Sequence, residues 1–184
     1  MVKAEAELNE LDAITGDGDC GSTVRAGAEA VLSVIENEMR SPSGMLFRIA
    51  NVLEDKMGGS SGSLLSLLFT AFAADIKINN EQIDHLDLTR GLGAGIRAMM
   101  EVGRASRGDR TMLDALIPAH EALETSNKDT AVENAARAAE EGAQLTKTLT
   151  AKAGRASYCK DRNTSHAPDA GAVMISHVFA AMAN

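Results

Sequence analysis

Residues 64–74 read LLSLLFTAFAA, a run that is apolar around the whole circumference of a helix. A helix without a polar face belongs in the interior of a protein. The run is too short to span a bilayer and has Ser and Thr inside it. We therefore expect a central, buried helix over residues 61–75, with the rest of the chain arranged around it.

Segments with apolar residues at helical spacing occupy both sides of this central run. The expected helices cover residues 3–12, 22–39, 45–57, 61–75, 87–104, 110–124, 129–150 and 170–183. A break is expected at Ser41–Gly44 and a kink at Pro118. The first helix resembles the back half of a longer one, so we expect it to be truncated. Alanine is abundant (31 residues), aromatic residues make up only 3%, and no segment has the pattern of a strand. We predict an all-α fold, a single domain over residues 1–184 built as an eight-helix antiparallel up-and-down barrel or bundle.

The charge balance argues against several classes of partner. Lys and Arg number 18 against 26 Asp and Glu, which gives a net charge of -8. No basic run is present, so neither a nucleic-acid groove nor binding to an anionic membrane is expected. The two cysteines, Cys20 and Cys159, form no CxxC pair. Together with a start that does not resemble a signal peptide, they favour a cytoplasmic protein with reduced thiols.

Four segments are rich in glycine and small polar residues, and each directly precedes an even-numbered helix. They are residues 16–23, 58–62, 108–111 and 168–171. In an up-and-down bundle the even-numbered helices point the same way, so their N-termini meet at one end. Helix N-termini offer N–H groups and a partial positive charge to anions. The pattern predicts a phosphate site at that end, the alternative being four separate helix caps with tight turns.

Three carboxylates accompany the first of these segments. Asp12, Asp17 and Asp19 lie within eight residues, separated by Gly16 and Gly18. Carboxylates this close repel one another unless a cation lies between them, and Mg²⁺ prefers oxygen ligands of this kind. We interpret the cluster as a metal site that shares its ion with a phosphate. The alternative is a solvated acidic turn.

Other phosphate- and metal-binding motifs do not fit. Residues 16–21 match GxGxxG, but that fingerprint requires a preceding strand, and here a helix is expected. The chain has no Walker A sequence, and Ile14 stands where an EF-hand counted from Asp12 requires an oxygen ligand. Arg155 precedes the last helix and could reach a phosphate at the same end, since arginine binds phosphate through two donors. The alternative for Arg155 is a solvated loop residue.

The motifs LNELDAITGDGDCGSTV, MGGSSGSL, GDRTMLDAL, AGRASY and PDAGA resemble, in this order and across essentially the whole chain, the nucleotide-binding L subunit or domain of dihydroxyacetone kinases. The resemblance implies a barrel of eight antiparallel amphipathic helices. It also implies ATP or ADP with two Mg²⁺ ions at one end of that barrel. Ala170 departs from the Asp-Pro-Gly sequence usual in the family.

The resemblance also implies roles for individual residues. The metal ligands would be Asp12, Asp17 and Asp19. The phosphate contacts would be Cys20, Gly21, Ser22, Thr23, Ser60 and Ser61. The rest of the nucleotide site would comprise Gly103, Thr111, Met112, Arg155, Asp169 and Gly171.

In the family, dihydroxyacetone binds to a separate K subunit or domain through a covalent bond to a histidine, and nothing in this chain resembles that part. The chain is thus expected to supply the phosphoryl donor and to be an incomplete kinase without its K partner. Two donors occur in the family: exchangeable ATP, or a fixed ADP that a phosphotransferase-system protein rephosphorylates. The Gly-Asp-Cys-Gly form at residues 18–21 is more like the ATP-dependent class. A kinase domain for another carbonyl substrate and a non-catalytic nucleotide or metal sensor remain alternatives.

Overall fold

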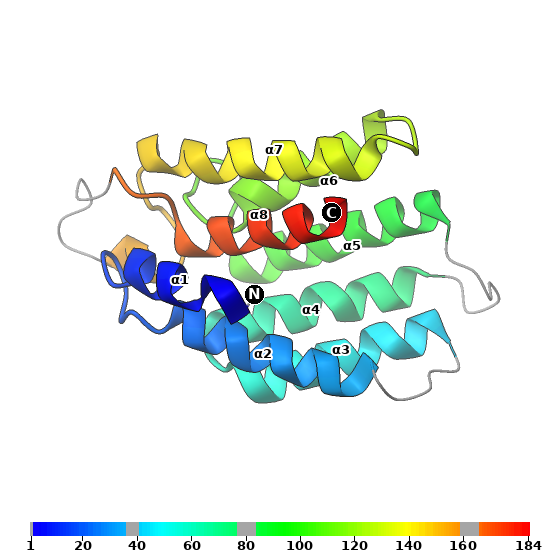
Figure 1. The fold of residues 1–184 in the computed structure, drawn as a ribbon, viewed down its shortest axis with the longest axis horizontal. Helices are drawn as coiled ribbons and strands as arrows, with labels where there is room; N and C mark the ends of the chain where they lie inside the picture. The colour runs from blue at the N-terminus through cyan, green and yellow to red at the C-terminus, as the bar shows by residue number, and fades with distance from the viewer. Residues whose placement is uncertain (1, 36–40, 77–83, 159–165) are drawn as a thin grey trace. The chain divides into compact units, whose positions relative to one another are not determined.

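The computed structural model describes residues 2–35, 41–76, 84–158 and 166–184. This part of the chain contains eight α-helices and three short 3-10 helices and no strand (Figure 1). The prediction of an eight-helix, all-α fold is confirmed. Among the described helices, none combines the length and the apolar character that a membrane crossing requires.

The helices follow the predicted order. They are α1 (Glu5–Asp12), α2 (Cys20–Ile35), α3 (Pro42–Met57), α4 (Gly59–Asp75), α5 (His85–Gly103), α6 (Leu113–Thr125), α7 (Ala131–Leu145) and α8 (Ala170–Ala183). The 3-10 helices are η1 (Val2–Ala4), η2 (Thr146–Thr148) and η3 (Arg155–Tyr158).

The helix boundaries differ from the prediction where local capping decides them. Residues 41–44 were expected to separate two helices, but Ser41 is the N-cap of α3 and its hydroxyl accepts the N–H of Gly44 at 3.1 Å. Pro42 occupies the first helical position, where a missing N–H has no cost. Residues 36–39 of the predicted second helix lie outside the described residues. The predicted helix over 129–150 is shorter, because η2 tightens the chain after Leu145.

The chain divides into two compact units. The central unit comprises residues 25–102, and the terminal unit comprises residues 1–24 and 103–184. The expectation of a single domain stays a prediction.

Within the central unit, neighbouring helices run antiparallel. The Ser43 hydroxyl, near the start of α3, donates to the carbonyl of Ala73 near the end of α4 at 3.1 Å. Arg90, near the start of α5, pairs with Asp75 at the end of α4, with Nε and Oδ2 2.6 Å apart. Contacts between the start of one helix and the end of its neighbour are those that an up-and-down arrangement requires.

Helix α4 is less enclosed than its sequence suggests. The residues it buries are Gly62, Ser66, Leu68, Phe72 and Ala73. Leu64, Leu65, Leu67 and Phe69 are only partly buried, so the prediction of an all-round buried helix is wrong. Helix α3 packs against α4, and α5 approaches it where the Gly91 backbone lies on the Phe72 ring. The apolar composition of α4 therefore predicts more burial around the helix than the structure shows.

In the terminal unit, α6, α7 and α8 pack against one another and α1 packs on α8. Helices α6 and α7 approach closely at Gly142, where a Cβ atom would overlap the carbonyl oxygen of Asp114. That carbonyl lies one helical turn before Pro118, which has no N–H to donate to it. Helix α6 runs through Pro118, and the kink stays a prediction.

Candidate functional site

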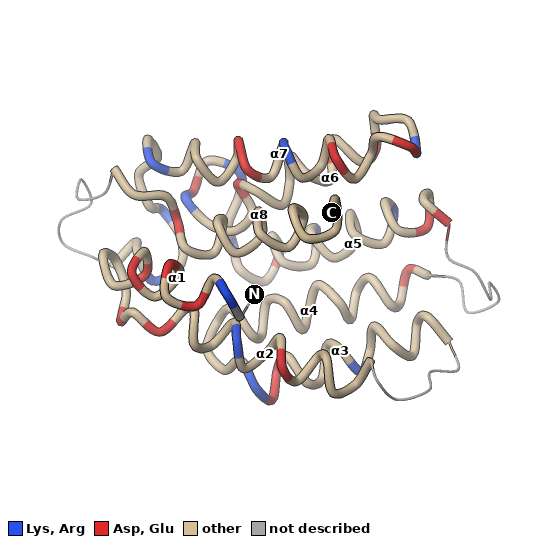
Figure 2. Tube along the Cα trace, in the orientation of Figure 1, with Lys and Arg blue, Asp and Glu red and all other residues tan. Residues whose placement is uncertain are grey.

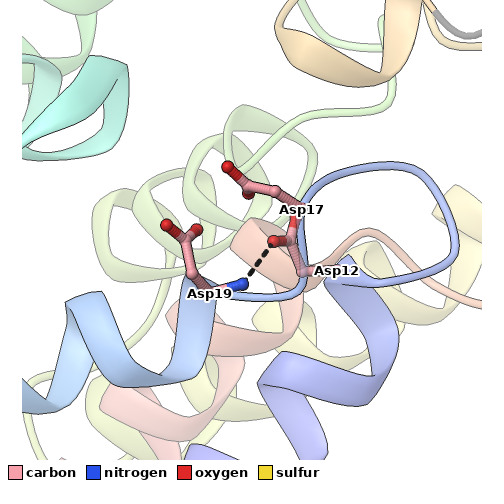
Figure 3. A group of neighbouring side chains, drawn as sticks. All are labelled: Asp12, Asp17 and Asp19. Atoms are coloured by element: carbon pink, nitrogen blue, oxygen red, sulfur yellow. Dashed lines mark hydrogen bonds between the residues drawn. The ribbon is translucent and has the colours of Figure 1, made fainter.

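Asp12, the last residue of α1, organises the loop that leads into α2. Its Oδ2 atom accepts the main-chain N–H groups of Gly18 at 2.9 Å, Asp19 at 3.1 Å and Cys20 at 3.3 Å. Figure 3 shows the bond from Asp19. Gly18 has a φ of 77°, a conformation that glycine adopts without strain. The carboxylate thus folds residues 13–19 back onto the end of α1 and caps the start of α2.

This folding brings the three predicted carboxylates together. One side-chain oxygen from each of Asp12, Asp17 and Asp19 lies within 4.8 Å of the other two. Asp17 and Asp19 share a hydrogen bond, which raises the pKa of Asp19 above its usual range. Desolvation raises the pKa of Asp17, but its hydrogen bonds to Asp19 and Arg155 outweigh this and hold it below the usual range. Two carboxyl groups at this distance need a proton or a cation between them.

Arg155 is the basic residue of this cluster. It is the first residue of η3, and its Nη1 forms an ion pair with Oδ1 of Asp17. Both side chains are about half exposed, at 53% and 54%. The hydrogen bond to Asp17 raises the pKa of Arg155 further, so the guanidinium is always charged. Acidic residues of α1 and the following loop are marked in Figure 2.

Cys20 and Asp169 lie next to the cluster. Burial and the negative charges of Asp12 and Asp169 raise the pKa of the Cys20 thiol to about 12. Asp169 is the N-cap of α8, and its Oδ1 accepts the N–H of Ala172 at 2.9 Å. Burial raises the pKa of Asp169 to about 6, although the nearby charge of Arg110 lowers it.

The loop of residues 104–112 is held by a buried carboxylate. Asp114 accepts the N–H of Gly108 at 2.5 Å and that of Thr111 at 2.8 Å, and it is only 3% exposed. Gly108 has a φ of 92°, and the bulky Arg110 adopts a φ of 60°. A left-handed arginine is uncommon and persists only where its surroundings hold it.

This loop is also tied to two later segments. The buried Arg110 donates from Nη2 to the carbonyl of Ala167 at 3.2 Å. The N–H of Lys152 donates to the carbonyl of Asp109 at 3.1 Å. The loop therefore links the segment before Arg155 to the segment before Asp169.

Thr111, Met112 and Gly171 also lie in the terminal unit. A Cβ atom built on Gly171 would lie 3.4 Å from Cβ of Met112 and 3.2 Å from Oδ1 of Asp169. The start of α8 thus approaches the residues that precede α6. The predicted nucleotide residues Met112, Asp169 and Gly171 therefore lie side by side.

Ser22 and Gly21 face α1 instead. The Ser22 N–H donates to Oδ1 of Asn9, and its hydroxyl donates to Oε1 of Glu5, both at 3.1 Å. The Gly21 backbone lies so close to the Glu5 carbonyl that a Cβ atom would overlap it. In this structure both residues join α2 to α1, and their contact with phosphate stays a prediction.

The other predicted residues have less definite surroundings. Thr23 lies in the first turn of α2, and Gly103 is the exposed last residue of α5. Ser60 and Ser61 lie in the first turn of α4, in the central unit. Their contact with phosphate stays a prediction.

Sequence reasoning missed Asn9, Asp114 and Arg110. Thr111 and Asp114 have the Ser/Thr-x-x-Asp/Glu spacing that signals the start of a helix, so Asp114 could have been found. Asn9 lies three residues before Asp12, on the neighbouring helical turn. No local signal marks a buried Arg110, because its partner at residue 167 is distant in the sequence.

The chain belongs to the DAK2 domain family, whose model matches residues 14–184. It is 38% identical over 189 residues to triokinase/FMN cyclase of Rattus norvegicus, covering 99% of this chain and 32% of that protein. It is 36% identical over 178 residues to dihydroxyacetone kinase 1 of Saccharomyces cerevisiae, covering 94% of this chain and 30% of that one. The chain is thus a member of the dihydroxyacetone kinase family and spans about a third of the length of these relatives.

A solved relative has the same fold. The dihydroxyacetone kinase of C. freundii, in complex with AMP-PNP and Mg²⁺, matches with a TM-score of 0.80 and 33% identity. The match covers 99% of this chain and 31% of that one.

Proposed function

We propose that this chain is the nucleotide-binding part of a dihydroxyacetone kinase, which presents Mg-ATP to a substrate held by a separate K subunit or domain. The observation that carries the proposal is the group of three carboxylates, with oxygens within 4.8 Å of one another, beside the start of α2 and Arg155. The family supports it, as does the solved relative that contains AMP-PNP and Mg²⁺.

The donor set fits magnesium. Mg²⁺ prefers hard oxygen ligands and usually binds through one or two carboxylates together with substrate phosphates. Asp17 and Asp19 are exposed, so their oxygens are accessible from solvent. Asp12 is fixed by three N–H groups on Oδ2 and is the rigid member of the set. We propose that Asp12, Asp17 and Asp19 hold two Mg²⁺ ions, which when bound neutralise the charge of the phosphates.

The protein's own groups would position the nucleotide. Phosphoryl transfer depends mainly on positioning and electrostatic stabilisation. In our proposal the first turns of α2 and α4 contact phosphates through Cys20, Gly21, Ser22, Thr23, Ser60 and Ser61. Arg155 binds a phosphate through its guanidinium. Gly103, Thr111, Met112, Asp169 and Gly171 complete the nucleotide site.

The acceptor would come from another protein surface. The glycine-rich motifs offer no histidine that could hold a small ketone, and the chain spans about a third of its relatives. We therefore propose that the chain binds Mg-nucleotide alone but transfers phosphate only with a K partner.

Two donor mechanisms fit the site, and we favour exchangeable ATP. The alternative is a fixed ADP that a phosphotransferase-system protein rephosphorylates. Washing the purified protein with labelled ATP distinguishes them: rapid exchange supports ATP as the donor, whereas retained unlabelled ADP supports the alternative.

Titration calorimetry with MgADP, in the presence and absence of EDTA, tests the metal site. Affinity should collapse on chelation, because the carboxylates then repel the phosphates. Equal affinity in both conditions would contradict the metal site. A coupled kinase assay with an added K subunit tests the division of labour, and full activity of the isolated chain would contradict it. A chain that binds MgADP but stays inactive with K subunits would be a sensor.

A further inference from the structure

Arg155 contacts the acidic cluster through Asp17. Within the described residues, its contact with Asp17 is the one ion pair that the three carboxylates make. The guanidinium thus stands beside an oxygen that a metal ion would have to approach. Two positive groups at one carboxylate oxygen repel each other, so their occupancies are coupled.

We propose that Arg155 determines the order in which the site fills, an inference that rests on the function proposed above. Without nucleotide, Arg155 competes with the metal ion for Asp17. When the nucleotide arrives, Arg155 transfers to its phosphates and leaves Asp17 to the metal. The metal is thereby bound together with the nucleotide and not ahead of it.

The exposure of the ion pair makes such an exchange feasible. A buried pair would be held in place by the cost of separating its charges. The Arg155 and Asp17 side chains are both about half exposed, and pairs of this kind are weak because water screens them. A phosphate that accepts two parallel hydrogen bonds from the guanidinium is the stronger partner.

The backbone around Arg155 leaves room for movement. Arg155 begins the four-residue η3, and Gly154 before it has a φ of 68°. A Cβ atom at Gly154 would meet no atom of the described residues within 4 Å, so among these residues the turn is open on that side. Tyr158 at the other end of η3 is 87% exposed. Little packing would be lost if this turn shifted.

The test compares the metal alone with the metal nucleotide. Mn²⁺ binding without nucleotide is measured by electron paramagnetic resonance, and MgADP binding by calorimetry. Arg155→Gln should bind Mn²⁺ alone two- to fivefold more tightly than the unsubstituted protein, because its competitor is gone. The same variant should bind MgADP at least tenfold more weakly, because a phosphate ligand is lost. Arg155→Lys keeps the charge but not the paired donors. Its affinities for Mn²⁺ and for MgADP should lie between those of the unsubstituted protein and those of Arg155→Gln.

Lys152→Gln is the matched control. Lys152 lies three residues before Arg155, carries the same charge and is paired with Asp109, with Nζ and Oδ1 3.7 Å apart. This variant should change neither the Mn²⁺ affinity nor the MgADP affinity. An unchanged control would show that the effects of Arg155→Gln come from a specific contact and not from the change in net charge. Circular dichroism checks that the exposed substitutions leave the helices intact.

The outcomes separate the inference from the proposed function. If Arg155→Gln binds Mn²⁺ no more tightly than the unsubstituted protein, or if neither binds it, the inference is wrong. An equal gain in Mn²⁺ affinity in Lys152→Gln also overturns the inference. Failure of the unsubstituted protein to bind MgADP would instead overturn the proposed function.

Discussion

Oδ2 of Asp12 accepts the main-chain N–H of Asp19 at 3.1 Å, so one candidate metal ligand positions the backbone of another. Asp12 therefore serves the fold of the loop as well as the proposed site. Asp17 and Asp19, in contrast, extend from the loop into solvent. This difference in surroundings predicts different consequences for substitutions within one cluster.

Asp12→Ala should destabilise the metal-free protein, whereas Asp17→Asn and Asp19→Asn should leave it unchanged or slightly more stable. Loss of the Asp12 carboxylate removes the acceptor of three N–H groups and should lower the free energy of unfolding by about 2 kcal/mol. Neutralising Asp19, whose pKa is raised by Asp17, relieves repulsion when no cation is bound. Neutralising Asp17 relieves the same repulsion and loses only an exposed ion pair with Arg155, which contributes little. Urea unfolding in EDTA measures the stability of the three variants. In calorimetry without EDTA, all three variants should fail to bind MgADP. A large stability loss in Asp17→Asn would show that this residue is structural.

Asp169→Asn should gain stability at neutral pH and lose that advantage in acid. The pKa of Asp169 is about 6 in the native protein and near 3.8 ordinarily. Between these values the native state holds a proton that the unfolded chain has released, so stability falls as the pH rises through this window. The asparagine can still accept the N–H of Ala172 as a helix cap. The stability difference between variant and unsubstituted protein should rise by about 2 kcal/mol from pH 4.5 to pH 7.5. An equal difference at both pH values would contradict the raised pKa.

Cys20 should resist alkylation. A native pKa of about 12 leaves far less thiolate at pH 8 than an unfolded cysteine has. Because the thiolate is the reactive form, iodoacetamide should modify native Cys20 on the order of a thousandfold more slowly than in urea. Mass spectrometry of the peptide that contains Cys20 follows the reaction separately from Cys159. Rates within tenfold of each other would show that the thiol is neither buried nor surrounded by negative charge.

Gly142→Ala should be strongly destabilising, by about 2–3 kcal/mol. The added Cβ would overlap the Asp114 carbonyl, a backbone atom that cannot move without separating α6 from α7. Gly27→Ala is the matched comparison, since the nearest neighbours of its Cβ would be side-chain atoms of Met57 and Leu53, which can change rotamer, and not a backbone atom. Both changes add the same helix propensity, so the difference in melting temperature isolates the packing. Equal effects would show that the close approach at Gly142 is not needed.

Helical periodicity and turn residues were enough to predict the eight helices and their order. The alternation of Asp and Gly over residues 16–19 was enough to predict that Asp12, Asp17 and Asp19 gather. Both features are local, because the residues concerned lie within one or two turns of the chain. Local signals also place the start of α3, which the pair Ser41 and Pro42 defines once it is interpreted as a cap.

The remaining features depend on neighbours that are distant in the sequence. The apolar pattern of α4 does not say which of its faces other helices cover, so Leu64 and Phe69 were wrongly expected to be buried. The ion pair between Arg155 and Asp17 and the bond from Arg110 to residue 167 join segments that only the folded chain brings together. Such contacts produce no periodic pattern in the sequence.

The division of the chain into units has a consequence for its synthesis. The central unit is one continuous stretch, residues 25–102, and all its contacts can form as soon as that stretch has left the ribosome. The terminal unit needs residues 1–24 together with residues 103–184, so α1 must wait for α8, which is translated after the whole central unit. Leu8 is fully buried in the folded protein. Until α8 has been translated, the helix that covers α1 is missing. Helix α1 is thus packed well after it is made, and a nascent chain exposes it to chaperones and proteases until α8 emerges.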